Sequence, residues 1–201
     1  MSFWENTRKP VGLGGKLMVS LMNLGHSPVA WWGLRFLNVA PDAKVLDCGC
    51  GGGANIKRML KKCPQGIVKG IDYSPVSVEK SQKVNADAIA KGRCTILQGS
   101  VAKRIFAEGW FDAVTAFETV YFWPELPQCF HEIYRMLKPG GMFLICNESS
   151  GDTDKDEKWT KIIDGMTIYK DIELKAYLEQ AGFHDVQIQK KKSWLCVTAR
   201  K

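Results

Sequence analysis

The stretch VLDCGCGGG, residues 45–53, decides the fold of this chain. An apolar run ends in the acid Asp47, and glycines follow at positions 49, 51, 52 and 53 before a helical pattern begins at Ala54. Because glycine has no Cβ, the backbone can turn sharply here and approach a ligand closely. The N-terminus of the following helix offers unpaired N–H groups to a carboxylate or a phosphate. The stretch therefore predicts a buried strand, a ligand-binding loop and a helix.

Short apolar runs alternate with longer helical patterns along the rest of the chain. We expect strands at 44–47, 66–72, 93–98, 111–117, 142–146, 183–189 and 194–198, and helices at 54–63, 75–91, 125–137 and 171–181. Strand–helix alternation predicts an α/β fold with a mostly parallel sheet and helices on both faces. The last two strands lie too close together for a parallel crossover. They should pair as a hairpin, so one edge strand of the seven runs antiparallel.

The segments outside this alternation are a helical cap and a polar loop. Residues 17–23 and 29–37 are apolar helical segments, which we expect to form a cap (residues 1–42) on the core (residues 43–201). A chain of 201 residues suits a single domain. The polar segment 149–158 is expected to be a mobile loop, either a lid or simply exposed. Trp31 and Trp32 are candidates for the core or for a homodimer contact.

Composition excludes several classes of protein. The chain contains no apolar run long enough to cross a membrane, and we expect no secretory signal. Its seven scattered cysteines include one C-x-C pair, Cys48 and Cys50, without the partners of a zinc site. We expect reduced thiols, a cytoplasmic protein and no metal site. The net charge of +7 is spread along the chain, which favours a solvated surface, although a nucleic-acid partner stays open.

Two nucleotide cofactors are compatible with the glycine loop. Residues 49–54 satisfy the dinucleotide pattern G-x-G-x-x-A, and Asp72 ends the second strand, where a dinucleotide enzyme places its ribose-binding acid. Asp47 argues against that interpretation, because a carboxylate under the loop would lie beside a pyrophosphate. It is better placed to bond backbone N–H groups or the ammonium of a ligand.

Five segments, in order, resemble the motifs of class I S-adenosylmethionine-dependent methyltransferases. They are Asp47-x-Gly49-x-Gly51-x-Gly53 and residues 70–74 (GIDYS), 98–101 (QGSV), 111–117 (FDAVTAF) and 137–144 (LKPGGMFL). The resemblance covers about residues 43–147, and the antiparallel strand is also a feature of the family. It implies a Rossmann-like fold, S-adenosylmethionine as cofactor and S-adenosylhomocysteine as product.

The resemblance also assigns cofactor contacts. The methionine portion would face Gly49 and Gly51 with Asp47 nearby, and the ribose would bind Asp72. The adenine would lie along Tyr73 and be bordered by Gly99, Ser100 and Val101, and Ser74 is a further expected cofactor contact. Ser74 is in addition the expected N-cap of the helix that begins at Pro75. The family often has an acid at the position of Ser100. A serine hydroxyl accepts more weakly, so we expect a weaker adenine contact.

The acceptor side is expected to come from residues 117–124, which leave the fourth strand at its C-terminal end. Methyl transfer from a sulfonium needs alignment and exclusion of water, whereas a dedicated base is optional. Phe117 and Glu118 are candidate cofactor contacts; Glu118, Tyr121 and His26 are candidate catalytic residues. We expect the side chain of Phe122 to pack in the core. For Tyr121 and Trp123, core packing and a place in the site are equally expected. A helix-capping or structural role is the alternative for His26.

Four further polar positions complete the expectations for side chains. His131 and His184 are expected on the surface. Asn147 and Glu148 follow the fifth strand and are expected to orient an acceptor.

Motifs that are absent narrow the acceptor class. No Asn/Asp-Pro-Pro-aromatic sequence follows Phe117, and the chain has no Pro-Cys dipeptide, which disfavours methylation of amino groups on bases and of cytosine carbon. A small-molecule acceptor is therefore favoured. Three alternatives stay open: an RNA or tRNA methyltransferase, a non-catalytic module that binds the cofactor or its product, and, least favoured, a nicotinamide-dependent oxidoreductase.

Overall fold

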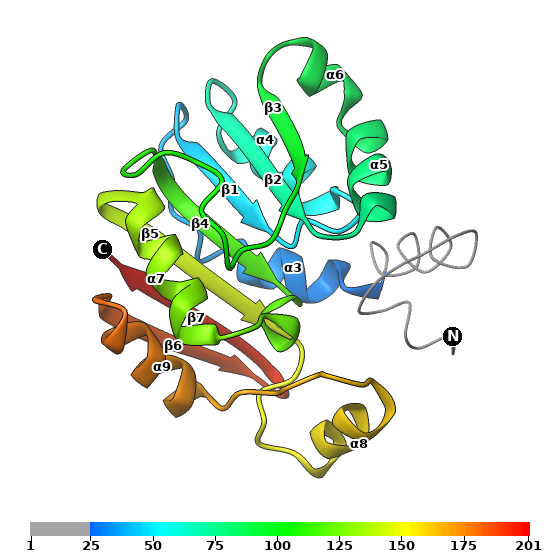
Figure 1. Ribbon diagram of the computed structural model, residues 1–201, viewed down its shortest axis with the longest axis vertical. Helices are drawn as coiled ribbons and strands as arrows, with labels where there is room; N and C mark the ends of the chain where they lie inside the picture. The colour runs from blue at the N-terminus through cyan, green and yellow to red at the C-terminus, as the bar shows by residue number, and fades with distance from the viewer. Residues whose placement is uncertain (1–24) are drawn as a thin grey trace.

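Seven strands form one sheet within residues 25–201, the part of the chain that this computed structural model describes. Their order is β3-β2-β1-β4-β5-β7-β6. The strands are β1 (Lys44–Cys48), β2 (Ile67–Asp72), β3 (Cys94–Gln98), β4 (Phe111–Phe117), β5 (Leu137–Asn147), β6 (His184–Lys191) and β7 (Trp194–Arg200). The first five strands pair in parallel with one another, and β7 runs antiparallel to both β5 and β6. The predicted mostly parallel sheet is confirmed, with its antiparallel strand inserted beside the edge strand β6 (Figure 1).

Helices cover both faces of the sheet (Figure 1). One face carries α3 (Ser27–Gly33), α4 (Ala54–Lys62), α5 (Pro75–Val84) and α6 (Ala86–Ala90), and the other carries α7 (Leu126–Met136) and α9 (Asp171–Gln180). Ile56 and Met59 anchor the buried cluster under the first group. Phe130, Ile133 and Leu178 belong to the cluster under the second group. Burial of both faces explains why the central strands read as continuous apolar runs.

Part of the predicted helical cap lies outside the described residues, namely the segment 17–23. The second cap segment forms α3, which ends at Gly33 rather than at residue 37. Beyond this point the backbone N–H groups of Arg35 and Phe36 bond carbonyls three residues earlier, which closes the helix in tight turns. Trp32 is 8% exposed and contacts Trp194, whereas Trp31 is 54% exposed, so only Trp32 belongs to the core.

The predicted helix over 75–91 is broken at Asn85. Ser74 caps α5 as expected, since its hydroxyl accepts from the backbone N–H of Ser77. The side-chain Nδ2 of Asn85 donates to the carbonyls of Ser81 at 2.9 Å and Gly53 at 3.0 Å. Asn85 therefore ends α5 and attaches it to the glycine loop, and the short α6 begins at the next residue.

Two other predicted boundaries are wrong. β5 begins at Leu137 rather than at residue 142, because Leu137 pairs with Phe111 before a register shift. The expected loop over 149–158 turns into helix α8 (Asp154–Ile162). A capping box starts this helix: the carboxylate of Asp156 accepts from the backbone N–H of Thr153 at 3.2 Å. The segment was predicted as a loop because its composition is polar.

The structure agrees with what the composition predicts for the cysteines and for membrane-spanning helices. All seven cysteines are buried free thiols, which act as small apolar side chains. Within residues 25–201, none of the helices combines the length and the apolar character needed to cross a membrane.

Candidate functional site

The candidate site lies where the strand order reverses, between β1 and β4. β1 is paired with β2 on one side and with β4 on the other, so the loops that follow these strands diverge at their C-terminal ends. In open α/β sheets this divergence forms the ligand crevice. The arrowheads of β1, β4 and β5 point toward the side of the molecule where α3 and α8 lie (Figure 1).

The glycine loop crosses over the end of β2. The backbone N–H groups of Gly49 and Cys50 donate to the carbonyl of Ile71 at 2.8 and 3.0 Å. Gly49 has a φ of +74°, and a Cβ there would lie 2.1 Å from Oγ1 of Thr119. Gly51 has a φ of +51°, and apart from its chain neighbours no atom of the residues that the structure describes lies within 4 Å of the position of a Cβ. The backbone at Gly51 is therefore accessible to a ligand.

Asp72 joins three of the predicted cofactor segments. One carboxylate oxygen accepts from the backbone N–H of Gly51 and the other from that of Ser74, both at 2.9 Å. The backbone N–H of Gly99 donates to the carbonyl of Asp72 at 2.9 Å. Burial raises the pKa of Asp72, and the hydrogen bonds from Ser74 and Gly51 oppose that shift. The residues expected around the ribose and the adenine are thus neighbours.

Asp47 lies beneath the loop, but its partner is a side chain. It is 1% exposed, and its Oδ1 accepts from the hydroxyl of Thr115 at 2.7 Å. Burial raises the pKa of Asp47 to about 7, against the hydrogen bond from Thr115 and with a contribution from the charge of Asp72. The loop N–H groups of Gly49, Cys50 and Gly51 bond elsewhere. The sequence motifs assign no role to Thr115, which is one of two polar residues in β4 and meets Asp47 only when β1 and β4 pair.

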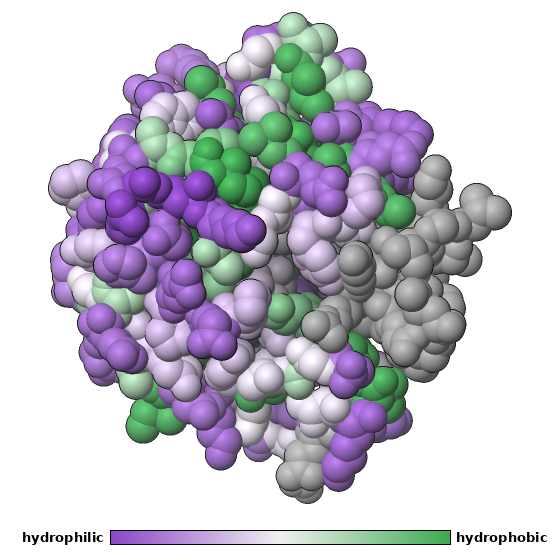
Figure 2. Space-filling view, viewed as in Figure 1, coloured by the Kyte–Doolittle hydropathy of each residue, from purple (hydrophilic) through white to green (hydrophobic). Residues whose placement is uncertain are grey.

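The predicted adenine side combines exposed and buried residues. Tyr73 is 40% exposed, so one aromatic side chain is accessible at the end of β2. Ser100 accepts from the backbone N–H of Ala102 at 3.3 Å, and Val101 is buried in the core. Ile105, which lies against Gly99, is a partly exposed apolar side chain. Figure 2 shows apolar side chains gathered on the side of the molecule where β3 lies.

Phe117 and Trp123 have their rings in the core. The ring of Phe117 lies against Gly33 of α3, and Phe117 is 7% exposed. Trp123 stacks on Phe143 at a centroid distance of 6.4 Å and an interplanar angle of 9°. Packing is therefore the outcome for Trp123. Phe122, expected to pack, is only partly buried.

Glu118 adopts a backbone conformation that is unusual for a side chain of its size. Its φ is +58°, a left-handed value that costs about 1–3 kcal/mol in residues other than glycine. The backbone N–H of Glu118 donates to the carbonyl of Cys146 at 3.0 Å, and its carboxylate accepts from the backbone N–H of Glu148. Burial, together with the charge of Glu148, raises the pKa of Glu118 to about 8.

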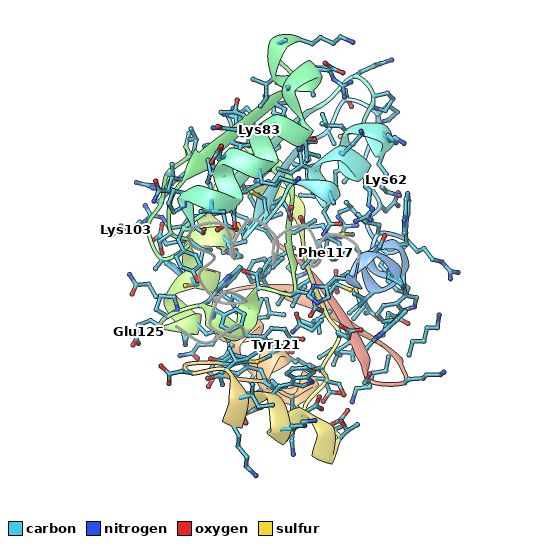
Figure 3. All side chains as sticks on the ribbon, turned by 90° about the vertical axis from the view of Figure 1, so that its right-hand side faces the viewer. Lys62, Lys83, Lys103, Phe117, Tyr121 and Glu125 are labelled. Atoms are coloured by element: carbon cyan, nitrogen blue, oxygen red, sulfur yellow. The ribbon has the colours of Figure 1, made fainter. Side chains whose placement is uncertain are left out.

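His26 and Tyr121 lie beside these two acids. The Nε2 of His26 is 3.9 Å from Oε2 of Glu148. Burial lowers the pKa of His26, and the charge of Glu148 opposes this. The hydroxyl of Tyr121 accepts from the backbone N–H of Ser149 at 3.0 Å, and burial raises its pKa well above the usual value. The three predicted catalytic candidates are thus brought to one edge of the sheet, and Figure 3 shows Tyr121 there below Phe117.

The structure agrees with some of the remaining predictions for polar residues and differs from others. His131 and His184 are exposed, as expected. Asn147 is fully buried, and neither its Oδ1 nor its Nδ2 has a hydrogen-bond partner within the described residues. Glu148, not Asn147, reaches the group formed by His26 and Glu118.

Comparisons with known proteins agree on the class. Residues 46–145 match the family model described as "Methyltransferase domain". Cycloartenol-C-24-methyltransferase 1 of Oryza sativa subsp. japonica is 35% identical over 109 residues, which are 54% of this chain and 31% of that protein. 24-methylenesterol C-methyltransferase 3 of Arabidopsis thaliana is 28% identical over 162 residues, which are 75% of this chain and 44% of that protein. The chain thus spans less than half the length of these curated relatives.

A solved structure repeats the fold over most of the chain. A SAM dependent methyltransferase from Aquifex aeolicus superposes with a TM-score of 0.77 at 18% identity, over 92% of this chain and 97% of that one. With the glycine loop, Asp72 and the strand order described above, these matches place the chain in the class I S-adenosylmethionine-dependent methyltransferase family.

Proposed function

We propose that this protein transfers a methyl group from S-adenosylmethionine to a small-molecule acceptor bound at the C-terminal ends of β4 and β5. The cofactor supplies an electrophilic methyl group on a positively charged sulfur. Asp72 would hold the ribose, Tyr73 would lie along the adenine, and the open backbone at Gly51 would let the methionine portion approach closely. Glu118, Tyr121 and His26 would face the acceptor.

The charge of the crevice is the observation that carries this proposal. Asp47, Asp72, Glu118 and Glu148 lie at one edge of the sheet, and none of them is ion-paired with a lysine or arginine within residues 25–201. A sulfonium or an ammonium group bound there would favour the ionised form of these acids, whose pKa values burial raises, and would be attracted by it. An acidic crevice also repels a phosphate backbone, which favours a small molecule over RNA as the acceptor. The sterol methyltransferases among the relatives, which by their names act on small molecules, support the same class.

Calorimetric titration with S-adenosylmethionine, S-adenosylhomocysteine and NAD tests the cofactor. We expect micromolar binding of the first two and none of NAD. A preference for NAD, or no binding of either adenosyl compound, would overturn the proposal.

Transfer of a radiolabelled methyl group tests the acceptor. The protein is incubated with labelled S-adenosylmethionine and a cell extract, and the products are separated into small molecules, RNA and protein. Label in the small-molecule fraction is the expected result, and label confined to RNA would contradict it. Absence of transfer, with normal cofactor binding, would instead identify a non-catalytic binding module.

A further inference from the structure

Three side chains from distant parts of the chain converge at the acceptor edge of the crevice. His26 precedes α3, Glu118 follows β4 and Glu148 follows β5. Each offers one ligand atom, an imidazole nitrogen or a carboxylate oxygen, and these atoms all lie within 4.8 Å of one another. The pairing of β4 with β5 sets the two acids side by side.

Among residues 25–201, no cationic side chain compensates the two acids of this group. The 3.9 Å between Nε2 of His26 and Oε2 of Glu148 is too long for a hydrogen bond. Glu118 accepts a backbone N–H from Glu148, but no lysine or arginine within residues 25–201 forms an ion pair with either acid. Two neighbouring carboxylates without a countercharge repel each other, and a bound cation relieves that repulsion.

The donor set indicates which cation fits. Magnesium and calcium prefer sites made only of oxygen, whereas an imidazole with carboxylates suits zinc and other divalent first-row transition metals. Metal–ligand bonds of about 2.0–2.2 Å bring the donor atoms of one ion to within about 4 Å of each other. The side chains of His26 and Glu148 are 36% and 47% exposed, so both have room to rotate over the small remaining distance.

We propose that His26, Glu118 and Glu148 bind one divalent transition-metal ion at the acceptor edge of the crevice. Three protein ligands leave coordination positions open. An acceptor with an oxygen or nitrogen donor would occupy one of them and be held in line with the methyl group. This role in positioning the acceptor rests on the proposed function, whereas binding of the metal does not.

Titration of the chelator-treated full chain with Co²⁺ alone tests the site. Its visible spectrum separates nitrogen and oxygen ligands from thiolates, which matters in a chain with seven free cysteines. We expect one Co²⁺ per chain at micromolar affinity, without a thiolate band. His26→Ala and Glu148→Gln should each weaken binding by at least about tenfold.

His184→Ala is the matched control. His184 also contacts a carboxylate, with Nδ1 3.0 Å from Oδ2 of Asp185, but it belongs to no group of three ligands among the described residues. Its loss should leave Co²⁺ binding unchanged. Lack of saturable binding, a thiolate spectrum, or equal affinity in His26→Ala would overturn the metal site. If the protein binds the organic cation tetramethylammonium but not Co²⁺, the metal site is overturned as well.

A parallel titration with S-adenosylhomocysteine separates the two proposals. If the product binds and Co²⁺ does not, the metal site is wrong and the proposed function stands. If Co²⁺ binds and the product does not, the proposed function fails and the metal site stands.

Discussion

The carboxylate of Asp72 accepts a hydrogen bond of 2.9 Å from the backbone N–H of Gly51, and thereby joins the end of β2 to the glycine loop after β1. Its other oxygen accepts from Ser74 at 2.9 Å. One buried acid thus organises both the loop and the start of α5. An incoming ribose would meet a carboxylate already fixed in orientation, which reduces the ordering needed on binding.

Asp72→Ala should weaken binding of S-adenosylhomocysteine by about 100-fold. The change removes charged hydrogen bonds to the ribose, each worth about 1.5–3 kcal/mol, and also frees the loop at Gly51. Calorimetric titration measures the loss. Asp87→Asn, an exposed acid on α6, is the control and should bind normally. Equal affinity of Asp72→Ala and the unchanged protein would remove Asp72 from the cofactor site.

Gly49→Ala should destabilise the fold more than Gly140→Ala. Both glycines have a φ of +74°, so both substitutions carry the same left-handed strain of about 1–2 kcal/mol. Only at Gly49 would the new Cβ meet another atom, Oγ1 of Thr119 at 2.1 Å. Urea unfolding of the two variants isolates the effect of this contact. Equal losses of stability would show that the loop moves away from Thr119 without penalty.

The fold was largely predictable because its signals are local. β4 has the predicted bounds, 111–117, since a mostly apolar stretch defines a strand that is buried on both faces. The break at Asn85 was not predictable in the same way. Its cause is a hydrogen bond to the carbonyl of Gly53, a residue that only the folded chain brings near.

The candidate site likewise combines residues that a local motif locates with residues that only the folded chain brings together. The glycine loop and Asp72 follow adjacent strands, so a motif locates both. The group of His26, Glu118 and Glu148 depends on three segments that meet only after β4 and β5 pair. No spacing in the sequence marks it, and the partner of Asp47, Thr115, was hidden for the same reason.

Asp47→Asn should make the protein more stable at pH 8 and leave its stability unchanged near pH 4. Burial raises the pKa of Asp47 to about 7 in the folded chain, against about 3.9 when unfolded. The folded state therefore binds the extra proton between these values, and stability falls as the pH rises from about 4 to about 7 and then levels off. The asparagine removes that loss, which has an upper bound of ~4 kcal/mol. Urea unfolding at several pH values measures it.

Asp112→Asn is a control of opposite sign. Burial acts to raise the pKa of Asp112, but the hydrogen bond from Lys138 and further contacts with Lys44 lower it. Stability from this group is present at neutral pH and is lost in acid as the pH falls through the lowered pKa. The asparagine variant should therefore be less stable than the unchanged protein at pH 8. A stability difference of the same sign for both variants would contradict the raised pKa of Asp47.

Glu118→Gly should stabilise the fold by about 1 kcal/mol while it abolishes methyl transfer. Glycine adopts the φ of +58° without the steric penalty that Glu118 carries, and it removes a partly buried acid that faces Glu148. Glu125→Gly is the matched variant, because Glu125 also has a positive φ, +42°, but lies at the start of α7. It should gain similar stability and keep its cofactor affinity and methyl transfer. We expect the two variants to differ in methyl transfer because the strained backbone at Glu118 places its carboxylate in the site. A loss of stability in Glu118→Gly would show instead that Glu118 has a structural role.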